Sequence, residues 1–280
     1  MKIEVILTPA ELPALAKRDL RGTACVVFDV LRATSTFVTA LHNGAKAIIP
    51  VGEISEALAF KNSEFGIRNS ESILLGGERD GVRIRAAQTG GTDFDLGNSP
   101  REFTPEKVSG KTIVSTTTNG TRALRGCAGA KTVLAGSFLN LGATAEFIRK
   151  LQPAEVLLVC AGTREQRADE DVLGVGALCE ILIRWGETTG EPNGEQTQSG
   201  SRVRSPHQKG IYEFSDSVET ALSAWRKAKS NLFAAVSGAE NARRLLAIPE
   251  LRDDVAFCLR QDVFNLVAAL GRDGAIRILI

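Results

Sequence analysis

Short runs rich in valine, isoleucine and leucine alternate along this chain with segments of helical periodicity, and this alternation constrains the fold more than any other feature. The expected strands lie at residues 2–7, 24–30, 46–51, 72–78, 81–85, 111–115, 131–137, 155–163 and 275–280. The expected helices lie at residues 34–44, 53–61, 119–126, 140–151, 170–186 and 215–238. Strands separated by helices typically form parallel sheets covered on both faces. The sequence therefore predicts an α/β fold, a layered α/β/α arrangement with a mostly parallel sheet and an active-site cleft at the strand carboxyl ends.

The domain organisation follows from length and from two polar stretches. A chain of 280 residues can bury one large core or two modest ones. We expect a single unit over residues 1–280, or two closely packed subdomains within it. Residues 86–92 and 186–210 interrupt the alternation, because both are poor in apolar side chains. The longer stretch has little apolar surface to offset its ordering entropy, so we predict a flexible insertion there.

Composition excludes several classes of partner. The 34 basic side chains nearly balance the 33 acidic ones, which argues against nucleic acid and acidic membranes as partners. No apolar run approaches the roughly 20 residues of a membrane span, and the first residues lack the apolar core of a signal peptide. The five widely spaced cysteines are typical of buried thiols in a reducing compartment, not of disulfides or a zinc site. We therefore expect a cytoplasmic protein that binds a small molecule, and this reading is compatible with a homodimer.

Polar side chains gather after five of the expected strands, where ligands of open parallel sheets bind. They are Asp29, Arg32, Thr34, Ser35 and Thr36; Glu78 and Arg79; Asp95, Asn98 and Ser99; Ser115 to Thr121; and Thr163, Arg164, Glu170 and Asp171. Hydroxyls, backbone N–H groups and arginines bind phosphate oxygens. Carboxylates repel an anion unless a hard cation lies between them, and a site of oxygen ligands without histidine favours magnesium, with manganese as the alternative, over zinc or copper.

Each of these groups also has a purely structural interpretation. The threonines at 116–118 could be strand-end hydroxyls, with Thr118 or Asn119 capping the next helix, and Thr34 and Ser35 could be caps as well. Glu170 and Asp171 could complement a helix dipole. Asp29 is harder to explain in this way, because it follows a buried strand where an unpaired charge is costly.

Several known kinds of phosphate site are absent from the sequence. No G-x-x-x-x-G-K-[ST] motif is present, which excludes a P-loop. A cysteine phosphatase needs an arginine six residues after its cysteine, but Gln166 stands six residues after Cys160. A haloacid-dehalogenase-type phosphatase needs a second aspartate two residues after the first, where this chain has Leu31. Two histidines are too few for the histidine-rich phosphatases.

Seven motifs in order resemble the 2-phosphosulfolactate phosphatase family: DVLRATST, LLGGER, FDLGNSP, TTTNGT, GSFLN, CAGT and the ED pair at 170–171. The resemblance runs from Val26 to Gly176 and resumes over residues 240–262. It implies a magnesium-dependent phosphomonoesterase that converts (2R)-phospho-3-sulfolactate to 3-sulfolactate and phosphate, a step of the coenzyme M type of biosynthesis. The alternatives are a phosphatase of the same family with another small dianionic substrate, and a non-catalytic anion-binding protein.

Residue roles follow from this chemistry. We predict Asp29, Arg32 and Glu78 as catalytic residues, with Asp29 as first metal ligand or, alternatively, as nucleophile. The further expected metal ligands are Glu78, Glu170 and Asp171. The expected substrate-binding residues are Thr34, Ser35, Thr36, Arg79, Asn98, Thr116, Thr117, Thr118, Asn119, Gly120, Thr121 and Thr163. In this assignment Arg32 neutralises the phosphate and Arg79 binds the sulfonate or carboxylate.

Overall fold

A computed structural model of the chain describes residues 1–15, 17–63, 68, 70–188 and 213–279. The strands are β1 (Lys2–Ile6), β2 (Thr23–Phe28), β3 (Ala47–Val51), β4 (Ile73–Arg79), β5 (Val82–Arg83), β6 (Thr112–Thr116), β7 (Thr132–Gly136), β8 (Glu155–Cys160), β9 (Glu213–Phe214), β10 (Val267–Leu270) and β11 (Ile276–Leu279). The helices are α1 (Leu12–Leu15), α2 (Ala33–His42), α3 (Ile54–Asn62), α5 (Ala86–Thr89), α6 (Pro105–Val108), α7 (Gly120–Gly126), α8 (Leu141–Leu151), α9 (Asp169–Thr188), α10 (Asp216–Ala228), α11 (Leu232–Ser237), α12 (Glu240–Leu246) and α13 (Arg252–Cys258).

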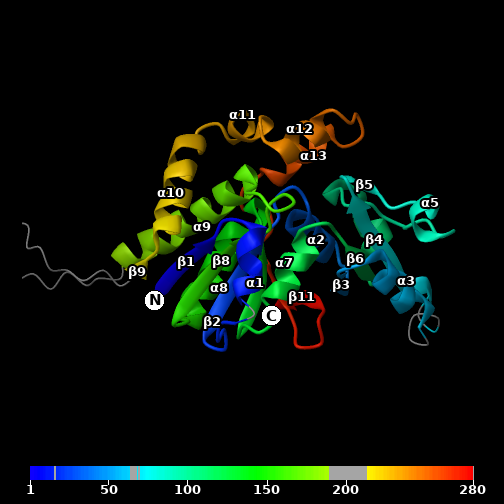
Figure 1. The fold of residues 1–280 in the computed structure, drawn as a ribbon, viewed down its shortest axis with the longest axis horizontal. Coiled ribbons are helices and arrows are strands. Elements are labelled where there is room, and N and C mark those ends of the chain that lie inside the picture. Colours follow the sequence, from blue (N-terminus) through cyan, green and yellow to red (C-terminus); the bar gives the residue numbers. More distant parts are fainter. Residues whose placement is uncertain (16, 64–67, 69, 189–212, 280) are drawn as a thin grey trace, which may run out of the picture.

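One sheet of 11 strands runs through the molecule in the order β5-β4-β6-β3-β11-β10-β7-β2-β8-β1-β9 (Figure 1). Strands β4, β6 and β3 are parallel to one another, as are β7, β2, β8, β1 and β9. The antiparallel hairpin of β10 and β11 joins these two parallel groups, pairing with β7 on one side and β3 on the other. The prediction of a mostly parallel sheet is confirmed.

Helices cover both faces of this sheet because its central strands alternate their apolar side chains between the two faces. In β2, Val26 and Phe28 pack in one core with residues of α8, α9 and α10. Cys25 and Val27 point to the other face and pack in a second core with residues of α1, α2 and α7. A smaller core fills the space between α3 and the strands β3, β4 and β6. The layered α/β/α prediction is therefore confirmed.

The structure departs from the sequence expectations in several places, and α12 and α13 were not among the expected helices. Strand β10 was not among the expected strands; its Ala-rich run Val267–Leu270 is held as a strand by β7 and β11. The helix expected over 215–238 is two helices, because the Asn231 side chain accepts a hydrogen bond from the Ala234 N–H and starts α11. Of the predicted insertions, 86–92 contains the short helix α5, while most of 186–210 falls in 189–212, outside the described residues.

Two further expectations concern side chains and the membrane. All five cysteines are free and buried, as predicted. No described helix combines the length and apolarity that crossing a membrane requires.

The segment from α10 to α13 arches over the carboxyl ends of the strands (Figure 1). Helix α10 packs against α9, and the chain then continues through α11, α12 and α13 along the upper edge of the molecule in this view. This arch brings residues 240–258 above loops that belong to the first two thirds of the chain. It closes one side of the cleft described below.

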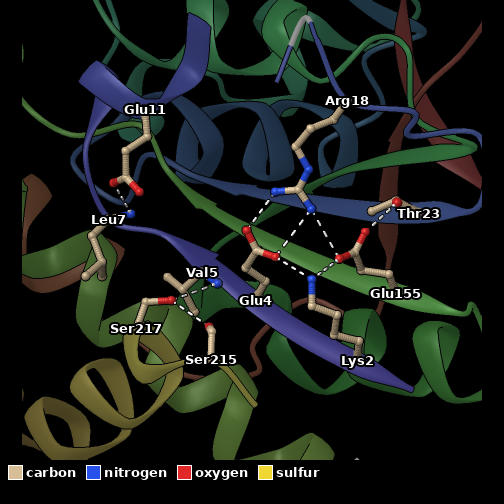
Figure 2. Close-up of polar contacts among 10 residues, drawn as sticks. All are labelled: Lys2, Glu4, Val5, Leu7, Glu11, Arg18, Thr23, Glu155, Ser215 and Ser217. Carbon is tan, nitrogen blue, oxygen red and sulfur yellow. Dashed lines mark hydrogen bonds and ion pairs between the residues drawn. The ribbon is translucent and has the colours of Figure 1, made fainter. Parts of the chain in front are cut away.

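A charged network ties together three strands near their amino ends (Figure 2). Arg18 donates to both oxygens of Glu4, at 2.7 and 3.3 Å, and to Glu155 at 3.2 Å. The Lys2 ammonium donates to the same two carboxylates at 2.7 and 2.9 Å, and the Thr23 hydroxyl donates to Glu155 at 2.9 Å. The network thereby links β1, β2 and β8 at the end of the sheet opposite the cleft.

Replacing Glu155 with glutamine should therefore lower the free energy of unfolding by up to about 1 kcal/mol at neutral pH, since the ion pairs are partly exposed. Burial raises the pKa of Glu155, but hydrogen bonds from Lys2 and Thr23 outweigh it and the net pKa is lowered. A lowered carboxyl pKa stabilises the fold above the unfolded value and loses that effect as pH falls through the folded value. Urea titrations should show the difference between wild type and variant shrinking below about pH 4. A difference that grows with acid would contradict this assignment.

Candidate active site

A cleft lies where the loops after β2, β4, β6 and β8 meet helix α12, at the predicted edge of the sheet. The loop after β2 contributes Asp29, Leu31 and Arg32. Strand β4 and its turn contribute Glu78, Asp80 and Gly81, and the loop after β6 contributes Thr118 and Asn119. Thr163 and Arg164 follow β8, Asn98 comes from the loop before α6, and Asn241, Arg244 and Leu245 come from α12. The cavity has a volume of about 50 Å³.

Asp29 is one of two buried carboxylates in this cleft. It directly follows β2, is 8% exposed, and its Oδ1 accepts a hydrogen bond from the Ala33 N–H at 3.1 Å. Burial raises the pKa of Asp29 to about 7; the Ala33 N–H opposes this shift, whereas the charges of Glu78 and Glu170 add to it. A raised pKa means that the surrounding protein groups do not fully stabilise the ionised form of Asp29. Carboxyl groups with such raised pKa values are typical of functional sites.

Gly120 is required for the position of Asp29. A Cβ atom at residue 120 would lie 2.6 Å from Asp29 Oδ2 and 2.6 Å from the Ala33 Cβ. Any side chain there would displace the carboxylate or the start of α2. The structure therefore places the Gly120 backbone against the aspartate of the neighbouring loop.

Glu78, at the end of β4, connects two loops of the cleft. Its Oε1 accepts hydrogen bonds from the Thr118 N–H at 2.9 Å and from the Thr118 hydroxyl at 3.0 Å. Its Oε2 accepts one from the Gly81 N–H at 2.8 Å. The side chain is 8% exposed and lines the cleft beside Asp29. The structure thus brings these two carboxylates to one cleft.

Arg32 lines the cleft, and its guanidinium is bound by two groups of the protein interior. Its Nη1 donates to Asp254 Oδ2 of α13 at 2.7 Å, and its Nη2 donates to the Gly81 carbonyl at 2.5 Å. Arg32 is 3% exposed and Asp254 is fully buried. A guanidinium has five N–H donors, so those not used by these partners are available to a ligand. The buried ion pair thus fixes the orientation of the cation.

The hydroxyls of Thr34, Ser35 and Thr36 point away from the cleft. They donate to the backbone carbonyls of Asp29, Val30 and Asn98, at 3.0, 2.9 and 2.7 Å. All three residues are fully buried, and none lines the cleft. The structure does not place them at the substrate; they fasten the loop that carries Asp29 and Arg32.

The TTTNGT turn is divided between the cleft and the interior. Thr118 and Asn119 line the cleft. Thr116 is buried and donates to the Gly52 carbonyl at 3.1 Å. The Thr117 hydroxyl accepts from the Thr121 N–H at 3.2 Å, and the Thr121 hydroxyl donates to the Thr117 carbonyl at 3.0 Å. Thr116, Thr117 and Thr121 therefore hold the turn and are not among the residues that line the cleft.

Arg79 is likewise outside the cleft. Its Nη1 donates to the Glu78 carbonyl at 2.7 Å and its Nη2 to the Thr116 hydroxyl at 3.1 Å. Neighbouring residues of a strand point to opposite faces of the sheet. Because Glu78 faces the cleft, Arg79 faces away from it, and the predicted contact of Arg79 with a sulfonate is not supported by its position.

Glu170 and Asp171 lie behind the loops of the cleft, at the start of α9. Asp171 accepts hydrogen bonds from the Val30 N–H at 2.8 Å and the Gly162 N–H at 2.9 Å. Glu170 Oε1 accepts from the Asn241 side chain at 2.7 Å, whereas its buried Oε2 has no hydrogen-bond partner among the described residues. Burial raises the pKa of both carboxyls. Neither residue lines the cleft.

The predicted four-carboxylate metal site is therefore not assembled as a cage. Among the residues that the structure describes, no three His, Cys, Asp or Glu side chains form a group that could hold a metal ion. The reason is local, because Asp171 is bound to two backbone N–H groups and Glu170 to Asn241. Magnesium, however, is commonly held by one or two carboxylates together with water and substrate phosphate. Asp29 and Glu78 fit that kind of site.

Seven residues of the cleft were missed as site residues: Leu31, Asp80, Gly81, Arg164, Asn241, Arg244 and Leu245. Asn241 donates to Thr163 Oγ1 at 2.6 Å as well as to Glu170, which places α12 against the loop after β8. Arg244 and Leu245 follow on the same helix, and Arg164 follows Thr163. Arg164 stood among the strand-end polar residues, and residues 240–262 carried part of the family resemblance. Nothing in the local pattern of α12 marks Asn241 or Arg244, because their role depends on the arch from α10 to α13.

The fold and the cleft define a class: an α/β protein with a strand-end pocket lined by acidic side chains, arginines and amide groups. The model of the 2-phosphosulpholactate phosphatase family matches residues 7–273. The chain belongs to this family, which confirms the resemblance and makes it a phosphatase, a phosphoric monoester hydrolase.

Proteins that are similar over nearly the whole chain support the same family assignment. A protein of Thermotoga maritima named "Probable 2-phosphosulfolactate phosphatase" is 37% identical over 268 residues, 96% of this chain and 95% of that protein. A protein of the same name in Caldanaerobacter subterraneus subsp. tengcongensis is 35% identical over 260 residues, 93% and 92% of the two chains. One in Synechococcus sp. strain CC9605 is 32% identical over 277 residues, 99% of each chain.

Proposed function

We propose that the protein hydrolyses (2R)-phospho-3-sulfolactate to 3-sulfolactate and phosphate, with Mg²⁺ as cofactor and Mn²⁺ as a substitute. The family supports the substrate, and the cleft supports the chemistry. The observation that carries the proposal is the buried Asp29 carboxyl, whose pKa of about 7 lies near physiological pH in a cleft that also holds Glu78 and Arg32. Such a reaction would belong to a coenzyme M type of biosynthesis in the cytoplasm, and both placements stay predictions.

Asp29 and Glu78 are the residues that would hold the cation, which would offset the negative charge of the phosphoryl group and its transition state. The chain's own groups have separate tasks. The free N–H groups of Arg32 bind phosphate oxygens, with Asn98, Thr118 and Asn119 of the lining as further polar groups. The Asp254 and Gly81 contacts keep Arg32 oriented before substrate arrives, so this electrostatic stabilisation needs no rearrangement.

A substrate panel tests the proposal directly. Phosphate release should be measured from phosphosulfolactate, 2-phospholactate, 2-phosphoglycerate and glycerol 2-phosphate at equal enzyme concentration. We expect the highest kcat/KM for phosphosulfolactate. A higher kcat/KM for one of the other phosphates would assign the site to that substrate, and no hydrolysis of any member with saturating Mg²⁺ would favour a non-catalytic anion-binding protein.

Removing divalent cations should abolish turnover. Two carboxylates that face one cleft with an anionic substrate repel it, so without a cation the substrate neither binds well nor reacts. Dialysis against EDTA should lower activity at least about a hundredfold, and added Mg²⁺ or Mn²⁺ should restore it. Mg²⁺ should also raise the melting temperature of the wild type, a readout that needs no substrate. Full turnover of exhaustively chelated protein would overturn the metal assignment.

A further inference from the structure

The cleft is lined by three carboxylates, Asp29, Glu78 and Asp80, and by three cations. Three arginines line it: Arg32, Arg164 and Arg244. Arg32 lies on its inner side, buried against Asp254. The other two come from the loop after β8 and from α12, on the side closed by the arch. Their partners decide what each is free to bind.

Arg164 is the unpaired cation of its loop. Its charged neighbours are engaged, since Glu165 accepts from Arg122 at 2.7 Å and Arg167 pairs with Asp169 at 3.0 Å. Arg164 is exposed and lines the cleft, and it forms no ion pair or side-chain hydrogen bond with the rest of the described chain. Its backbone φ of +57° lies in the left-handed region, which is uncommon for a residue other than glycine.

Arg244 flanks the same opening from α12. Its Cδ lies 3.4 Å from the position that a Cβ would take on Gly81, so its stem runs along the turn that also contacts Arg32. One terminal nitrogen donates to Glu240 at 2.9 Å, and the side chain remains 30% exposed. The 2.6 Å hydrogen bond between Asn241 and Thr163 fixes α12 beside the loop that carries Arg164. The two arginines therefore belong to one rim.

The inner end of the cleft disfavours a second anion. Asp29 and Glu78 lie there and repel anions. The positive charge of a cation held between them would be neutralised by the phosphate, which leaves none for a second anion. A sulfonate keeps its charge at any physiological pH and is best matched by a guanidinium. The rim provides guanidinium groups from Arg164 and Arg244, whereas Arg79 is directed away from the cleft.

We infer that Arg164, supported by Arg244, binds the anionic group of the substrate that is not transferred, a sulfonate or carboxylate. This inference rests on the proposed function for the phosphate end of the cleft. It makes Arg164 a specificity-determining residue: it selects phosphomonoesters that carry a second negative charge a few bonds from the phosphate. The phosphoryl chemistry itself stays with the inner residues.

The kinetic test compares substrates with and without the second charge. Arg164→Gln should raise KM for phosphosulfolactate by about 10- to 100-fold, the value of one charge-assisted contact, and change kcat little. For glycerol 2-phosphate, which lacks the second anion, kcat/KM should change by less than about threefold. Arg164→Lys should recover part of the loss, since lysine keeps the charge without the fork. Arg167→Gln, the same change at an exposed arginine of this loop, is the matched control.

A binding measurement separates this inference from the proposed function. By calorimetry, 3-sulfolactate should bind the wild type and lose at least about tenfold in affinity on Arg164→Gln, while the Kd of inorganic phosphate stays the same. The proposed function fails if the wild type does not hydrolyse phosphosulfolactate. The inference fails if 3-sulfolactate does not bind the wild type, if Arg164→Gln leaves its affinity unchanged, or if the variant loses as much on glycerol 2-phosphate as on the sulfonated substrate.

Discussion

Replacing Asp29 with asparagine should lower kcat at least about a thousandfold while the protein stays folded. Asparagine has nearly the same shape and can still accept the Ala33 N–H, but it carries no charge. Both roles considered for Asp29, metal ligand and nucleophile, need the ionised carboxylate. Phosphate release under saturating Mg²⁺ measures the loss, and circular dichroism confirms the fold.

The same substitution should make the protein more stable without metal. The folded pKa of Asp29, about 7, lies above its ordinary value of 3.8, so its contribution to stability is full below about pH 4 and is lost as pH rises through 7. Asparagine imitates the protonated form at every pH. At pH 8 in EDTA, the variant should therefore exceed the wild type by up to roughly 4 kcal/mol in the free energy of unfolding.

The exposed Asp169 provides the matched control for Asp29. Asp169→Asn should change neither kcat nor stability appreciably, because its partner Arg167 is half exposed and lies outside the cleft. An Asp29→Asn variant that keeps a tenth of wild-type activity would remove Asp29 from the reacting groups. A variant that is less stable than the wild type in EDTA at pH 8 would show that the carboxylate is well compensated by the fold.

Replacing Asp254 with asparagine should lower the free energy of unfolding by about 3–5 kcal/mol, the usual cost of leaving a buried charge without its partner. Asp254 is fully buried and accepts from Arg32 at 2.7 Å and from the Ser99 hydroxyl at 2.7 Å. Arg101, 3.8 Å from Asp254 and partly exposed, is itself a cation and so cannot compensate the charge of Arg32 in the variant. Urea denaturation followed by circular dichroism measures the change.

The adjacent residue provides the control for this prediction as well. Asp253 is 65% exposed in its side chain and pairs with Arg101 at 3.4 Å, so Asp253→Asn should cost less than about 1 kcal/mol. Replacing both members of the buried pair, Arg32→Met with Asp254→Leu, should recover stability relative to Asp254→Asn but leave the enzyme inactive. Equal losses of unfolding free energy for Asp253→Asn and Asp254→Asn would mean that the buried pair contributes no more to stability than the exposed pair.

The sequence predicts the layers and the edge of the sheet that carries the site, because apolar periodicity and strand-end polarity are local signals. It does not settle which polar side chains turn inward. Thr34, Ser35 and Thr36 are as polar as Thr118, yet their hydroxyls donate to backbone carbonyls of the protein interior. Strand parity would have helped with Arg79, since two adjacent strand residues cannot both face one cleft.

The residues that α12 contributes to the cleft could not be predicted either, and here the reason is the distance along the chain. Asn241 and Thr163 are 78 residues apart, and their 2.6 Å contact exists only after the chain has crossed above the sheet. No local periodicity encodes such a contact. Likewise, β10 has the composition of a helix and becomes a strand through its neighbours.

The central position of β10 and β11 has a consequence for biosynthesis. Ribosomes make these two strands after all the other described strands, at about 5–20 residues per second. Until they emerge, β3 and β7 are unpaired sheet edges in the middle of the nascent protein, and unpaired edges invite association with other chains. The two groups of parallel strands can therefore join into one sheet only after the hairpin of β10 and β11 has been synthesised. Chaperone demand during translation should be concentrated in that interval.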